Sequence, residues 1–239
     1  MGTLIRAIVF DLDGVLVDSE IWWDEVRQRF AAGLGRAWTE EDRHAVMGAN
    51  SRQWSATMRV RLRLDLSAGQ IEQAIVDAMV ERYRHEGAPE IDGAVETVRR
   101  LATEWPLALA SSSHRRVIDA ALDGTGLRDS FRVVISSDEV EHGKPAPDVF
   151  LEAARRLGAE PRDMLVVEDS LNGLKAARAA GMTAVLVPNR SIPPAPGAEA
   201  VADVVLERIA DLDPVAIDRD RRQADGRGGD PAEAERART

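Results

Sequence analysis

The sequence predicts an α/β protein with a Rossmann-like parallel sheet core, helices on both faces of the sheet, and an inserted all-helical cap domain. From about residue 91 onward, short apolar runs alternate with amphipathic stretches of roughly ten residues, a pattern typical of parallel strands covered by helices. Residues 18–88, in contrast, hold only helical patterns and directly follow the first apolar run. We therefore expect a core formed by residues 1–17 and 89–213, interrupted by a helical cap at 18–88.

The individual elements follow from local patterns. Each expected strand is a short apolar run bounded by turn residues, and the runs lie at 8–10, 107–110, 132–135, 164–167, 183–187 and 201–206. Each expected helix carries apolar residues three and four positions apart, and these segments lie at 19–34, 39–47, 51–64, 67–83, 93–103, 114–123, 147–157 and 170–180. Residues 214–239 are polar and lack this periodicity, so we expect a disordered tail there.

The composition excludes several classes of function. The net charge of −10 argues against nucleic acid or an anionic membrane as the partner, because both select for a basic surface. The absence of cysteine excludes disulfides, thiolate metal sites and a cysteine nucleophile. No apolar stretch reaches about 18 residues, and no signal-peptide pattern is visible. We expect a cytoplasmic protein that is a monomer or a weak homodimer.

Two aspartates directly follow the first expected strand. Asp11 and Asp13 are separated by one residue, so in an extended chain both side chains leave the same side of the backbone. Two neighbouring carboxylates raise each other's pKa unless a cation lies between them, and Mg²⁺ is the usual cation for such oxygen ligands. The D-x-D-G tetrapeptide alone is equally compatible with a polar turn. Three later clusters favour the catalytic interpretation.

Further polar residues follow the other strands. Ser111 follows the run at 107–110, Glu168 and Asp169 follow the run at 164–167, and Lys144 lies in G-K-P-A-P-D at the start of a helix. Ligand sites of open α/β sheets lie outside the carboxyl ends of the strands, so we expect these residues on one rim. A carboxylate can attack phosphorus, a second carboxyl group can transfer protons, and cations can neutralise phosphoryl oxygens. The set suits phosphoryl transfer.

Together the clusters resemble the four motifs of the haloacid dehalogenase superfamily, in the subgroup with a helical cap inserted after the first motif. The motifs are D-L-D-G-V-L-V-D-S-E, L-A-S-S-S, G-K-P-A-P-D and V-V-E-D-S-L-N-G, and the match covers about residues 4–212. The resemblance implies that Asp11 is the nucleophile and Asp13 the general acid and base. It also implies that Ser111 and Lys144 hold the phosphoryl group.

The same resemblance implies a metal cofactor. Mg²⁺ would be held by Asp11, the backbone carbonyl of Asp13 and Asp169, with Glu168 as a further ligand or as a partner of one. The expected activity is Mg²⁺-dependent hydrolysis of a small phosphorylated metabolite, a sugar phosphate above all, through an aspartyl-phosphate intermediate.

Two other functions compete with this hypothesis. A β-phosphoglucomutase would carry a histidine in the first cap helix and a lysine in a later one, where this sequence has Trp23 and Ala78. An aspartyl-phosphate signalling receiver also gathers carboxylates and a lysine on a parallel sheet, but the helical insertion at 18–88 speaks against it. Asp13 argues against a dehalogenase, since the second aspartate serves phosphate chemistry.

Substrate recognition is expected from the cap and from the residues after the second motif. The candidate substrate-binding residues are Trp23, Arg52, Trp54, Ser112, His114 and Arg115. Tryptophan faces stack on sugar rings and arginine binds anions. The alternative for the tryptophans, Trp22 included, is packing between cap helices. His44 carries no ligand pattern, and we expect it to be solvated or structural.

Overall fold

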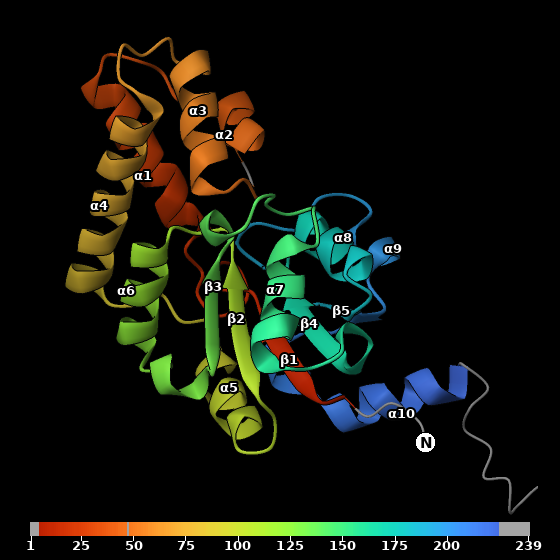
Figure 1. The fold of residues 1–239 in the computed structure, drawn as a ribbon. Helices are drawn as coiled ribbons and strands as arrows, with labels where there is room; N and C mark the ends of the chain where they lie inside the picture. The colour runs from red at the N-terminus through yellow and green to blue at the C-terminus, as the bar shows by residue number, and fades with distance from the viewer. Residues whose placement is uncertain (1–4, 47, 225–239) are drawn as a thin grey trace, which may run out of the picture.

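The computed structural model describes residues 5–46 and 48–224, which build a parallel sheet with helices around it (Figure 1). The strand order is β3-β2-β1-β4-β5-β6, and every neighbouring pair is parallel. The strands are β1 (Ala7–Phe10), β2 (Leu107–Ser111), β3 (Val133–Ser136), β4 (Met164–Glu168), β5 (Thr183–Leu186) and β6 (Val204–Val205). The predicted α/β architecture is confirmed.

The first strand lies at the centre of the sheet and is buried on both faces. Ile8 and Phe10 join one hydrophobic cluster, whereas Ala7 and Val9 join the other. This division follows from the two-residue period of a strand, which sends successive side chains to opposite faces. The apolar run after the N-terminus therefore joins both halves of the core.

Helices cover the two faces of the sheet. Helices α5 (Ala94–Ala102) and α6 (Arg115–Thr125) bury their apolar residues in the first cluster. Helices α7 (Asp148–Leu157) and α8 (Leu171–Ala179) bury theirs in the second. None of the helices formed by residues 5–46 and 48–224 combines the length and the apolar character needed to span a bilayer.

Four further helices form an insertion between β1 and α5, drawn at the top of Figure 1. They are α1 (Glu20–Gly33), α2 (Glu40–Val46), α3 (Ser51–Arg61) and α4 (Ala68–Glu86). Capping boxes start two of them: Asn50 with Gln53 at α3, and Ser67 with Gln70 at α4. The first hydrophobic cluster continues from the sheet into this insertion, so the two parts share apolar packing.

The chain enters and leaves the insertion through two adjacent segments. Val17 forms an antiparallel bridge with Glu90. Asp18 N–H donates to the Pro89 carbonyl at 2.7 Å, and a second bond, 3.0 Å long, runs from the residue 91 N–H to the residue 16 carbonyl. The two crossings therefore lie side by side as a short paired ribbon.

Two expectations about the C-terminal part were wrong. Residues 201–206 were expected as one strand, but α9 (Ala198–Val201) precedes a two-residue β6 there. Residues 214–224 were expected to be disordered, but they form α10 (Pro214–Ala224), where Ile217 is buried and Arg221 donates to the Arg162 carbonyl at 3.2 Å. Only Pro214, Ile217 and Asp218 are buried among residues 214–223, which is too few to leave a periodic apolar signal. The expectation for 225–239 lies outside the described residues.

Candidate active site

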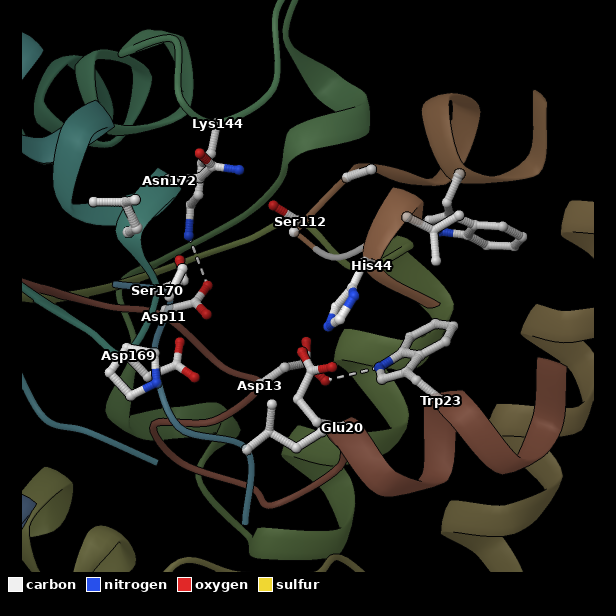
Figure 2. A pocket seen from close by; sticks show the side chains of 18 of the residues that line it. Asp11, Asp13, Glu20, Trp23, His44, Ser112, Lys144, Asp169, Ser170 and Asn172 are labelled. Atoms are coloured by element: carbon white, nitrogen blue, oxygen red, sulfur yellow. Dashed lines mark hydrogen bonds and ion pairs between the residues drawn. The ribbon is translucent and has the colours of Figure 1, made fainter. Parts of the chain in front are cut away.

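Polar side chains from three segments meet at the carboxyl ends of the central strands. Asp11 follows β1, Glu168 ends β4, and Lys144 reaches both from the loop before α7. Its Nζ donates to Asp11 Oδ1 at 2.7 Å, to Glu168 Oε1 at 2.6 Å and to the Ala110 carbonyl at 3.1 Å. All three charged side chains are buried, so this is a desolvated ion-pair network at the strand ends. Figure 2 shows its contact between Lys144 and Asp11.

The turn after β1 brings a further carboxylate close to Asp11. Gly14 has a φ of +81°, and a Cβ on it would lie 2.0 Å from Asp169 Oδ2, so only glycine allows this approach. Carboxylate oxygens of Asp11, Glu168 and Asp169 lie within 4.8 Å of one another. Three converging hard oxygen donors could hold a divalent cation such as Mg²⁺.

The two carboxylates after β4 have different surroundings. Glu168 Oε2 accepts from the N–H groups of Asp169 and Ser170 and from Ser170 Oγ, at 3.2, 3.1 and 2.9 Å, while its Oε1 is bound by Lys144. Within the described part of the chain, the Asp169 carboxylate accepts no hydrogen bond. Asp169 is therefore the carboxylate that is free to bind a cation, and Glu168 anchors Lys144 and the start of α8.

This group carries more negative than positive charge. Burial raises the pKa of Asp11 to about 8, and Lys144 opposes this rise while Glu168 and Asp13 add to it. Burial and Glu168 likewise hold the pKa of Asp169 well above its ordinary value. Burial alone would lower the pKa of Lys144, but Asp11 and Glu168 outweigh it and raise that pKa. A bound cation would favour the ionised carboxylates.

Asp13 is held by donors from two separate segments. Its Oδ1 accepts hydrogen bonds from Ser19 Oγ and, at 3.1 Å, from Trp23 Nε1. Its Oδ2 accepts from Ser113 Oγ at 2.7 Å and from Ser111 Oγ at 3.4 Å. The insertion and the loop after β2 thus fix the orientation of the carboxyl group, which points into the space above β1 (Figure 2).

A cavity of about 350 Å³ lies between the strand ends and the insertion. Its core side includes Asp11, Asp13, Ser112, Lys144 and Asp169. Its insertion side includes Glu20, Trp23, Arg27, His44 and Trp54. The volume is in the range of small-molecule sites, and both charged groups and aromatic rings face it.

Three of the predicted substrate-binding residues line this cavity: Trp23, Trp54 and Ser112. The two indole rings are buried, and their centroids are 6.2 Å apart. Each tryptophan therefore serves both as cavity wall and as packing between helices of the insertion, which joins the two alternatives considered for them.

The other three predicted substrate-binding residues lie outside the cavity. Arg52 donates to the backbone carbonyl of Asp138, which links the insertion to the core. His114 is the N-cap of α6, and Arg115 pairs with Asp119 at 3.1 Å on the surface of that helix. Each of these side chains forms its polar contacts away from the strand ends, and none of the three lines the cavity.

Three charged or titratable residues of the cavity wall were not predicted as site residues: Glu20, Arg27 and His44. Glu20 lies beside the site, and its burial, with the nearby charge of Asp13, raises its pKa to about 7. His44, expected to be solvated or structural, lies in the cavity wall (Figure 2). Positions 20, 23 and 27 share one face of α1. The helical spacing from Trp23 could therefore have identified Glu20 and Arg27 as site residues.

Comparison with known proteins identifies the family to which the chain is similar. The family model of haloacid dehalogenase-like hydrolases matches residues 5–181. The chain is 29% identical over 214 residues to the bifunctional riboflavin kinase/FMN phosphatase of Arabidopsis thaliana, of which it spans 55%. It is 30% identical over 223 residues to Hexitol phosphatase B of Escherichia coli (strain K12), covering 87% of this chain and 94% of that protein.

A solved structure adds a match in three dimensions. CbbY from Rhodobacter sphaeroides in complex with phosphate aligns with a TM-score of 0.75 at 27% identity, covering 87% of this chain and 96% of that one. The family match spans the four motifs up to the helix after the fourth, including the residues that meet at the strand ends. The chain therefore belongs to the haloacid dehalogenase-like hydrolases, as its motifs predicted.

Proposed function

We propose that this hydrolase removes the phosphoryl group from small phosphorylated metabolites, sugar phosphates above all, with Mg²⁺ and through a phosphorylated Asp11. The observation that carries the proposal is the pair Asp11 and Asp13 at the end of β1, facing one cavity, with Lys144 bound to Asp11. The names of the relatives support it, since Hexitol phosphatase B is a phosphatase and the CbbY structure holds phosphate.

Asp11 would be the nucleophile. Lys144 binds Oδ1, and within the described residues Oδ2 accepts no hydrogen bond, so Oδ2 is available to attack. A bond forms between Oδ2 and phosphorus while the bond between phosphorus and the leaving oxygen breaks, which gives an acyl phosphate. The ammonium of Lys144 reduces repulsion between the carboxylate and the incoming anion.

Asp13 would move the protons. In the first step its carboxyl group gives a proton to the leaving oxygen, so the product departs as an alcohol. In the second step the resulting carboxylate takes a proton from water as the water attacks the acyl phosphate and releases inorganic phosphate. Ser113 and Trp23 would keep the carboxyl group in the position that both transfers require.

The donor set fits a magnesium ion. Asp169 is free of hydrogen bonds within the described residues, it lies near Asp11, and the surplus of buried negative charge calls for a cation. We propose that Asp11, Asp169 and the Asp13 backbone carbonyl hold the ion, with Glu168 supporting the site through Lys144. When bound, the ion would neutralise charge on the phosphoryl oxygens and on the carboxylates.

The insertion, residues 18–88, would act as a cap domain over the strand ends. Its helices supply one wall of the cavity, and the paired crossings near 17–19 and 87–92 would serve as the hinge. Substrate entry and product release would then depend on movement about this ribbon.

Two features favour a phosphatase over a mutase. Trp23 occupies the position where the mutase pattern has histidine, and its Nε1 donates to Asp13 at 3.1 Å. Ala78, at the position of the mutase lysine, is absent from the described cavity wall. Neither position offers a titratable group that could retain the substrate during a second phosphoryl transfer.

Phosphate release tests the proposal. The protein is assayed at neutral pH with Mg²⁺ against sugar phosphates, hexitol phosphates, phosphoglycolate and β-glucose 1-phosphate, with glucose 6-phosphate measured in parallel. We expect turnover that Asp11→Asn abolishes and Asp123→Asn, at an exposed surface carboxylate, retains. Glucose 6-phosphate formed without phosphate release would indicate a mutase, and a single equivalent of phosphoryl transfer would indicate a receiver.

A further inference from the structure

Arg27 in α1 is buried, and the part of the chain that the structure describes offers no partner to its guanidinium. The residue is 8% exposed, and its Nε is buried without a hydrogen-bond acceptor among these residues. No carboxylate of residues 5–46 and 48–224 lies within 4.0 Å of its guanidinium nitrogens. Buried arginines are almost always paired, so an unpaired one in a cavity wall indicates a missing anion.

Two tryptophans hold the guanidinium in place. Its Cζ lies 5.0 Å from the centroid of Trp23 and 5.3 Å from that of Trp54. These cation–π contacts stabilise the charge, but they provide no acceptor for the N–H groups at the edge of the guanidinium, and no hydrogen bond joins those groups to another described residue. Trp23 also donates to Asp13, so Arg27 lies one indole ring away from the proposed acid and base, on the side of the leaving group.

We propose that Arg27 binds a second anionic group of the substrate, a carboxylate or a second phosphate, at the end remote from the transferred phosphoryl group. This inference rests on the proposed function and narrows its substrate class to phosphomonoesters that carry another negative charge. A planar fork of N–H groups suits both anions, because each offers two coplanar oxygens. Arg27 is the only arginine in the cavity wall formed by the described residues.

Neighbouring carboxylates do not satisfy Arg27. Asp24 accepts from Trp38 Nε1 at 2.8 Å and pairs with Arg43 at 3.5 Å. Glu20 lies on the same face of α1 but forms no ion pair with Arg27 within 4.0 Å. If Arg27 served only to neutralise Glu20, its loss would affect all substrates equally, and this difference can be measured.

The test uses Arg27→Met, which keeps an unbranched apolar stem and removes the guanidinium with its charge. Arg82→Met is the matched control, since Arg82 also lies over a tryptophan, 4.4 Å from the Trp22 centroid, but pairs with Glu25 at 2.5 Å outside the cavity. Kinetics compare 2-phosphoglycolate with 2-hydroxyethyl phosphate, and propane-1,3-diol bisphosphate with 3-hydroxypropyl phosphate. The first pair tests a carboxylate as the second anion, and the second pair tests a phosphate.

In the wild type we expect KM to be lower for the member of at least one pair that carries the second anion. Arg27→Met should reduce its kcat/KM about 10- to 100-fold, mainly through KM, while the uncharged counterpart changes less than about twofold. The ratio of kcat/KM for the substrate with the second anion to kcat/KM for its counterpart should be unchanged in Arg82→Met. In Arg27→Lys this ratio should lie between those of the wild type and Arg27→Met.

Two results would overturn the inference: equal losses for both members of each pair, or a wild type without preference for the second anion. The wild-type preference and Arg27→Lys keep the test valid if Arg27→Met does not fold. Failure of the proposed function would look different, because the wild type would then release phosphate from none of the substrates.

Discussion

Replacing Lys144 with methionine should destabilise the protein through its buried charges. The ammonium lies 2.7 Å from Asp11 and 2.6 Å from Glu168, with no other cationic side chain described at either carboxylate. Methionine fills a similar volume, so the substitution changes charge and hydrogen bonding far more than packing. Two buried carboxylates would lose their shared partner.

The magnitude follows from the burial of the ion pairs. Removing one partner of a buried ion pair costs about 3–5 kcal/mol, because the remaining charge stays desolvated. The cost should grow with pH. Burial already raises the pKa of Asp11 from 3.8 to about 8, and Lys144 opposes that rise, so the variant's pKa is higher still.

The sign of the pH dependence follows from proton binding. A carboxyl group whose pKa is higher in the folded state binds a proton there that the unfolded state has lost, so the free energy of unfolding falls as pH rises. In the wild type this fall ends near pH 8, whereas in Lys144→Met it continues. The difference in the free energy of unfolding between the wild type and Lys144→Met should therefore increase above pH 8, by at most about 1.4 kcal/mol per pH unit.

Urea denaturation, followed by tryptophan fluorescence, measures the free energy of unfolding of the wild type and of Lys144→Met at pH 6, 7.5 and 9 without added metal. The protein has five tryptophans for the signal. Lys175→Met is the matched control, because Lys175 is the other lysine of the chain and is exposed on α8. A loss below about 1 kcal/mol, or a gap that does not change with pH, would refute the buried-charge explanation.

Two further predictions concern the proposed metal site. Gly14→Ala should weaken Mg²⁺ binding and lower Tm, because the new Cβ would lie 2.0 Å from Asp169 Oδ2. Gly158→Ala is the control: its φ is also positive, +67°, but no atom lies within 4 Å of the added Cβ, so it should lower Tm without changing Mg²⁺ binding. Thermal scans and Mg²⁺ titrations separate the two, and equal effects on Mg²⁺ affinity would contradict the close approach. EDTA should abolish phosphate release and Mg²⁺ should restore it, since Asp11 and Asp169 need a cation; full activity in EDTA would contradict a metal requirement.

The core could be predicted closely because its signals are local. A buried strand such as β1 must be apolar throughout, and a parallel topology places every strand's carboxyl end at the same edge, so Asp11 and Glu168 meet although about 157 residues separate them. Helix α10 docks through Pro214, Ile217 and Asp218, and so few buried residues leave no apolar period in the sequence.

The wall formed by the insertion was harder to predict, because it depends on how helices pack. Arg52 and Arg27 are both insertion arginines, but Arg52 finds a carbonyl on the core surface while Arg27 is enclosed by two tryptophans. The spacing from Trp23 places Arg27 on the same face of α1, but only the packing of α3 brings Trp54 against its guanidinium. His44 has no ligand motif around it, and only the position of α2 brings it to the cavity. Tertiary packing thus decides which polar residues face the substrate.

The paired ribbon between the core and the insertion has a consequence for how such a protein can change. The chain leaves the core at Asp18 and returns at Pro89 within one hydrogen bond, 2.7 Å long. A different set of helices could therefore be grafted between these two points without moving β1 or Asp11, provided that the new helices replace the donors that Ser19 and Trp23 offer to Asp13. Closing a new segment across so short a gap costs little extra chain entropy as the segment lengthens. The insertion's side of the cavity wall can thus be replaced separately from the carboxylates at the strand ends.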